Sequence, residues 1–176
     1  MQNSFAQIKS SLLQAPLPPD IGEPSGASSV EIEIAENALT IQFPSDLKEW
    51  LHVVNSSCVG GGGFVGVNSR LESLDMEMIF DCYPQWKEKS WFPVASDGSG
   101  NYYVLFSNGE KQSVAFIDVA EDPGELTYVV ASSLVLFLDA FIRKESGDNT
   151  WPFREQAVLQ RDPDLASIKV APMPWE

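Results

Sequence analysis

The stretch that most constrains the fold runs from Trp91 to Phe106 and reads WFPVASDGSGNYYVLF. Two apolar runs, rich in aromatic and β-branched residues, flank a short polar segment, and each run is typical of a buried strand. Gly98 and Gly100 permit positive φ, and the side chains of Asp97 and Asn101 can satisfy nearby backbone groups. The pattern therefore predicts a sharp reversal between two strands at the centre of a sheet.

A second hairpin follows directly. The Asn-Gly pair in Ser107–Glu110 favours a tight turn that joins a strand over 102–106 to one over 113–117. An acidic loop over 118–125 precedes a further strand over 126–130, and Ser132 or Ser133 can cap a largely buried helix whose apolar stripe begins at Leu134. Beyond Gly147 we expect a short helical piece to Arg161 and an irregular end.

The first half of the chain is predicted to be mainly helical. Residues 2–14 carry an apolar helical stripe, and prolines and glycines over 15–27 then end regular structure, which indicates an appended helix and a tether. Residues 28–39 alternate like a strand but also carry the capping box Ser28 and Glu31, and we interpret them as a helix. The next helix is expected to be capped by Ser45 and to end near Asn55.

Residues 60–82 give weaker signals. Gly60 to Gly63 is expected to be a flexible connector into a short strand over 64–67. A helix or mixed segment follows, with Asp75 and Glu77 on its wetter side. The predicted organisation is residues 1–27 as an N-terminal helix and proline-rich tether, followed by one α+β domain over 28–176.

Composition limits the possible partners. With 25 acidic and 11 basic residues the formal net charge is −14, which argues against a basic face for nucleic acid or an anionic membrane. It favours a basic partner, or only solubility. Two isolated cysteines fit a reducing cytosol, and neither a signal-peptide core nor a run of membrane-spanning length is present, so a cytoplasmic location is expected.

Each motif that resembles catalytic or cofactor chemistry lacks an essential part. The glycine run has no Gly-Lys-Ser/Thr, and Ser99 lacks the Gly-x-Ser-x-Gly context of a nucleophile elbow. His52, the single histidine, is expected at a helix surface or boundary. Asp97, Ser99 and Asn101 begin like a calcium loop but lack its glycine and closing glutamate. We therefore predict no enzyme, no cofactor and no metal site.

Four stretches together resemble the SUKH superfamily of fungal cell-wall regulators and bacterial toxin-immunity proteins: AENALTIQFPSDLKEWLHVVNSS (35–57), WFPVASDGSGNYYVLF (91–106), SVAFIDV (113–119) and ASSLVLFLDAFI (131–142). The chain departs from the usual pattern at Gly100-Asn101, where members carry Gly-Asp, and at Asn55-Ser56, where they carry Asn-Gly. The resemblance implies an antiparallel-rich sheet flanked by helices.

In bacteria the resemblance also implies a non-enzymatic protein that neutralises a cognate toxin, for example a nuclease. The alternative is a regulatory or scaffold module; a small hydrolase is a weaker third reading. Acidic residues could steer a basic toxin to the interface, and exposed aromatic residues would supply its hot spots. The residues predicted to bind the partner are Asp97, Asp118, Glu121, Asp122 and Glu125, followed by Asp75 and Glu77.

Overall fold

The computed structural model describes residues 4–18 and 23–176. Within them, six strands form one antiparallel sheet in chain order: β1 (Ser57–Val59), β2 (Gly62–Phe64), β3 (Phe92–Ser96), β4 (Tyr102–Asn108), β5 (Lys111–Ile117) and β6 (Tyr128–Ala131). The predicted hairpins are confirmed, because Ser96 pairs with Tyr102 and Asn108 with Lys111. The pair β3–β4 occupies the middle of the sheet, as the aromatic stretch indicated.

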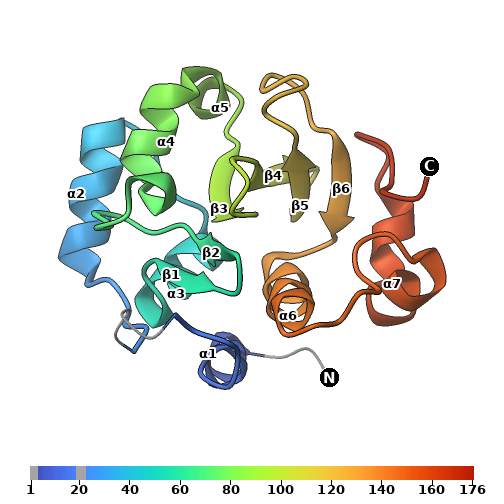
Figure 1. Ribbon diagram of the computed structural model, residues 1–176. Helices are drawn as coiled ribbons and strands as arrows, with labels where there is room; N and C mark the ends of the chain where they lie inside the picture. The colour runs from blue at the N-terminus through green and yellow to red at the C-terminus, as the bar shows by residue number, and fades with distance from the viewer. Residues whose placement is uncertain (1–3, 19–22) are drawn as a thin grey trace.

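Helices surround the sheet (Figure 1). They are α1 (Phe5–Leu12), α2 (Ser29–Leu39), α3 (Ser45–Val53), α4 (Met76–Cys82), α5 (Pro84–Glu88), α6 (Leu134–Glu145) and α7 (Glu155–Arg161), with 3₁₀ turns η1 (Glu72–Leu74) and η2 (Pro163–Ser167). The predicted α+β class is thus confirmed.

Helices cover both faces of the sheet, and β4 is therefore buried on both sides. Neighbouring residues of a strand point to opposite faces. The ring of Tyr102 lies 5.7 Å from Trp86 of α5, whereas the ring of Tyr103 lies 5.0 Å from Phe137 of α6. The two apolar runs found in the sequence therefore read as buried strands because helices pack on either side of them.

The N-terminal helix belongs to the same core. Ile8 and Leu12 are fully buried, and α1 packs against α3 and α6. The segment after it is tied down by backbone hydrogen bonds, from Gly60 to the carbonyl of Pro16 and from Asn55 to that of Ser25. Residues 2–3 of the predicted helix and 19–22 of the predicted tether lie outside the described residues. The boundary at residue 27 stays a prediction, but α1 is packed rather than loosely appended.

Two local predictions are wrong. Ser45 does not cap α3: the helix begins one residue earlier than expected, with Pro44 at the N-cap position and no side-chain cap bond. The glycine run is not a connector either, since Gly62 and Gly63 lie inside β2 and only Phe64 of the predicted 64–67 strand is in a strand. A Cβ on Gly62 would lie 2.4 Å from the carbonyl oxygen of Ser96, so close strand packing requires glycine there.

The helix caps elsewhere follow the sequence. Ser28 and Glu31 form the predicted capping box of α2, which resolves the ambiguity between helix and strand in favour of helix. Ser133, rather than Ser132, caps α6. Among the described residues, no helix has both the length and the apolar character needed to cross a lipid bilayer.

Candidate partner-binding surface

Most of the predicted partner-binding residues gather at one end of the sheet. Because the strands are antiparallel, β3 ends, β4 begins, β5 ends and β6 begins at the same edge. The β3–β4 turn (97–101) and the β5–β6 loop (118–127) therefore meet there. We call these two segments, together with Tyr128, the acidic end of the sheet.

The carboxylate of Asp97 organises the β3–β4 turn. Its Oδ1 accepts hydrogen bonds from the backbone N–H of Ser99 at 2.7 Å and of Asn101 at 3.1 Å, and its Oδ2 accepts one from the Asn101 side chain at 3.0 Å. Gly98 and Gly100 have φ values of +80° and +99°. Asp97 thus has a structural role besides its charge, and its side chain is half-buried.

Asn101 joins the turn to the β5–β6 loop. Its Oδ1 accepts a hydrogen bond from the backbone N–H of Val119 at 3.1 Å. The neighbouring Asp118 accepts bonds from the backbone N–H groups of Ala120 and Glu121 and so starts the loop as a turn. Asn101 stands where the usual pattern has the Asp of Gly-Asp, and its side-chain amide hydrogen-bonds to both segments at once.

The tip of the loop rests on α5, beside which it lies in Figure 1. The indole N–H of Trp86 donates to the carbonyl of Pro123 at 2.5 Å, and Lys89 donates to that of Gly124. Asp122 accepts from the Gly124 N–H at 2.7 Å. The loop backbone is therefore fixed, and it presents its carboxylates on a defined scaffold.

Glu121 and Glu125 are the free acidic groups of this loop. Both residues are exposed, and among the described residues their carboxylates make no hydrogen bond or ion pair. These two carboxylates stay hydrated and can interact with a cationic group of another molecule. They differ in this respect from Asp97, Asp118 and Asp122, whose oxygens already serve the backbone.

Asp75 and Glu77 lie apart from these residues, at the start of α4. Asp75 is only 6% exposed, which differs from its expected wetter position, because its carboxylate caps the helix. It accepts from the backbone N–H of Ser69 at 2.6 Å and of Met78 at 3.1 Å. Glu77 is exposed, without a side-chain partner in the described chain. Of this pair, Glu77 alone presents an accessible charge.

Two aromatic residues, Tyr128 within the acidic end and Phe153 beside it, were not singled out by the sequence. Phe153 is 59% exposed, and its ring lies 6.0 Å from Tyr128, which in turn stacks on Phe116 at 5.0 Å. Burial, together with the charges of Asp97 and Asp118, raises the pKa of Tyr128 to about 12. The signal for Tyr128 was its position next to the acidic loop; Phe153 lies far along the chain and reaches this place only through the fold.

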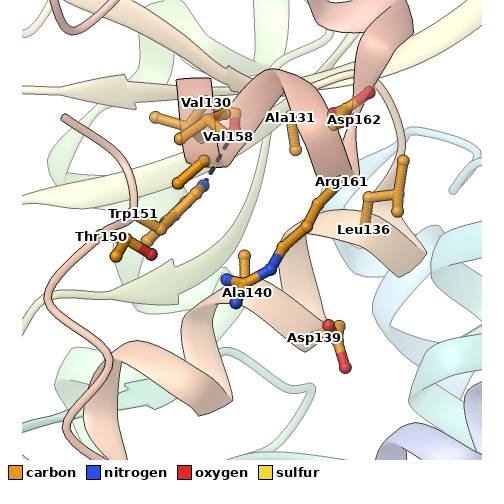
Figure 2. Close-up of a pocket in the computed structure, with 11 residues that line it drawn as sticks. Val130, Ala131, Leu136, Asp139, Ala140, Thr150, Trp151, Val158, Arg161 and Asp162 are labelled. Atoms are coloured by element: carbon orange, nitrogen blue, oxygen red, sulfur yellow. Dashed lines mark hydrogen bonds between the residues drawn. The ribbon is translucent and has the colours of Figure 1, made fainter. Parts of the chain in front are cut away.

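A small pocket lies between β6, α6 and α7, away from the loop carboxylates. Figure 2 shows Val130 and Ala131 along one side, Trp151 donating its indole N–H to the Val130 carbonyl, and Arg161 reaching from α7 toward Ala140. The ionic groups of the pocket have partners: Asp162 accepts from Ser132, and Arg161 pairs with Asp148 at 2.8 Å. Asp139, the other carboxylate of the lining, pairs with Arg143 at 2.7 Å.

The residues weighed as catalytic candidates have ordinary structural places. His52 is exposed on α3, with its Nδ1 2.9 Å from the Ala27 carbonyl oxygen, which confirms a surface position. Ser99 is exposed in the turn and donates its backbone N–H to Asp97. Across residues 4–18 and 23–176, no three His, Cys, Asp or Glu side chains cluster closely enough to hold a metal ion.

Comparison with known proteins places these features in a family. The model of the SMI1 / KNR4 family (SUKH-1) matches residues 26–140, which is well over half of the chain and spans α2 to most of α6. A search among curated proteins found no match. The matched region includes the whole acidic end of the sheet but neither α1 nor Phe153.

Proposed function

Because the chain belongs to the SMI1 / KNR4 family (SUKH-1), we propose that it is a bacterial immunity protein that binds a cognate toxin domain and neutralises it by occluding its active site. Proteins of this family are commonly immunity proteins and are generally non-catalytic. The proposed mechanism is stoichiometric binding, with no reaction carried out by the chain itself.

The observation that carries this proposal is the combination of free carboxylates and exposed aromatic surface at one end of the sheet. Glu121 and Glu125 extend from an anchored loop, and Phe153 is exposed next to Tyr128. Charges of one sign accelerate encounter with an oppositely charged partner, whereas buried aromatic residues supply most of the affinity of an interface. A toxin that acts on nucleic acid would carry complementary basic groups in its active site.

Co-expression tests the proposal. The chain is produced in a sensitive host together with the toxin domain encoded beside its gene, and growth and complex formation are measured. We expect the wild type to protect and Phe153→Ala to weaken the complex by about 30-fold, the loss typical of an aromatic hot spot. Replacing Glu121 and Glu125 by Lys is expected to slow association and to flatten its dependence on salt.

The matched control is Glu110→Lys, which reverses an exposed charge in the β4–β5 turn at the opposite end of the sheet. Protection should be unchanged by it. Absence of both protection and a complex for the wild type would refute the immunity function. Recovery of a partner that is not a toxin would instead favour the regulatory or scaffold alternative.

A further inference from the structure

The outer face of α2 carries two large aliphatic side chains that are not part of the core. Val30 is 63% exposed and Ile34 is 62% exposed, whereas Ile32 on the buried face is 3% exposed. Residues four apart lie on the same side of a helix, so Val30 and Ile34 are neighbours. The strand-like alternation of this segment therefore comes from apolar residues on two opposite faces of a helix, of which only one packs on the core.

The two outer side chains lower the helix propensity of α2 without a matching gain from burial, because both are β-branched and remain in water. Their position is nonetheless fixed. Before the helix, the backbone N–H of Ala27 donates to the Leu51 carbonyl at 2.8 Å. Near its end, the carboxylate of Glu36 accepts from the Phe43 N–H at 2.6 Å. The outer face of α2 is thus an anchored apolar ridge in contact with solvent.

The exposed apolar surface continues beyond α2. Figure 1 shows α4 beside α2, and Glu31 of α2 lines the same hollow, of about 560 Å³, as Leu71 before η1. Leu71 is 41% exposed, and Met78 of α4 is 42% exposed. We call Val30, Ile34, Leu71 and Met78 the α2–α4 surface. They are four of the seven large apolar side chains exposed in the part of the chain that the structure describes, so exposed apolar area is concentrated here.

Two carboxylates flank this surface, those of Glu33 on α2 and Glu77 on α4. Both residues are exposed, and within the described chain neither carboxylate makes a hydrogen bond or an ion pair. The two charged residues that line the hollow, Glu31 and Arg70, offset each other, so the excess charge is negative. A second copy of the chain is therefore a poor occupant, because the same glutamates would meet between two chains that each carry a net charge of −14.

We propose that the α2–α4 surface docks into an apolar cleft of the toxin domain whose rim carries lysine or arginine. The inference rests on the proposed function, and it adds a second contact region to the acidic end of the sheet. The segment η1 approaches both regions, because its Ser73 carbonyl accepts from the hydroxyl of Tyr102 at the start of β4 at 3.3 Å. Clefts that bind single-stranded nucleic acid combine basic groups with aromatic walls, and an ordered ridge would fill one at little entropic cost.

The docking surface is tested by isothermal titration calorimetry of the full chain with the toxin domain encoded beside its gene. Val30→Lys and Ile34→Lys each place a cation in an apolar, base-rimmed cleft, and each is expected to raise the dissociation constant by about 30-fold or more. Glu33→Gln combined with Glu77→Gln removes charge alone, and about fivefold is expected. Leu13→Lys is the matched control, because Leu13 is 41% exposed but follows α1, outside the surface.

Unfolding of the free chain separates docking from folding. Val30→Lys and Ile34→Lys should leave the urea midpoint unchanged or slightly raised, because lysine has a higher helix propensity than the residues it replaces. Ile32→Ala, on the buried face, should lower the midpoint. A midpoint lowered by both lysine variants would show that the outer side chains serve the fold, and it would overturn the proposal.

Two further results would also overturn it. One is a wild-type dimer, seen by sedimentation velocity, that Ile34→Lys dissociates, since the surface would then belong to a second copy. The other is full affinity and protection with both Val30→Lys and Ile34→Lys, which removes the docking surface and leaves the immunity function in place. A wild type that neither binds the toxin domain nor protects removes both proposals.

Discussion

The β3–β4 turn and the β5–β6 loop carry acidic residues to the same end of the sheet, but they use them differently. In the turn, three hydrogen bonds converge on Asp97 and two left-handed glycines set the path of the chain. In the loop, the backbone is anchored by Trp86 and Lys89 of the α5 region, and the carboxylates of Glu121 and Glu125 remain free. Charge that looks uniform in the sequence is thus divided into structural aspartates and accessible glutamates.

The largest effect that separates the two segments is expected at their glycines. Gly98→Ala would place a Cβ 1.7 Å from the carbonyl oxygen of Gly61 at a left-handed position, so we expect a loss of about 3 kcal/mol or more in the free energy of unfolding. Gly124→Ala in the loop should cost less than about 0.5 kcal/mol, because it meets only the Asp122 side chain at 3.1 Å. Urea unfolding measures both.

Gly100→Ala is the control for backbone conformation alone. Its φ is +99°, but no atom lies within 4 Å of the added Cβ, so about 1 to 2 kcal/mol is expected. A Gly98→Ala variant as stable as Gly100→Ala would show that the turn is not wedged against the β1–β2 hairpin.

A smaller difference is expected between the aspartates of the two segments. Asp97→Ala leaves two backbone N–H groups and one side-chain amide without their acceptor, and it should lower the free energy of unfolding by about 2 kcal/mol. Asp122→Ala removes a single bond, to the Gly124 N–H, and about 0.5 to 1 kcal/mol is expected. Thermal and urea unfolding of the pair check this order, and equal losses would contradict it.

Much of the sheet could be predicted because its signals are local. Gly98, Gly100 and the pair Asn108-Gly109 each specify a reversal within a few residues, and the flanking runs are apolar on both faces. The family resemblance rests on these same stretches, and the match over residues 26–140 confirms it.

What the sequence did not predict depends on contacts between distant segments. Gly62 and Gly63 read as a flexible linker because nothing local reveals that β3 lies against them. Asp75 was expected to be solvent-exposed. Its burial depends on the chain around Ser69 and η1, which the local sequence pattern does not reveal. Phe153 reaches the acidic end only in the folded chain, so composition could indicate an acidic surface but not the exposed aromatic residue beside it.

The smallest expected effect concerns the pKa of Tyr128, which a carboxylate from each of the two segments raises. Its pKa is raised to about 12, first by burial, then by Asp97 of the turn and last by Asp118 of the loop. Since the folded chain holds the proton more tightly than the unfolded chain, this contribution to stability is fully present below pH 10 and is lost as the pH rises toward 12. Ultraviolet titration of tyrosinate, with Tyr128→Phe as the difference reference, isolates this one group.

Asp97→Asn should lower the pKa of Tyr128 more than Asp118→Asn does, and neither should return it to 10, because burial remains. A larger shift from Asp118→Asn would mean that the loop, rather than the turn, dominates the field at this end of the sheet.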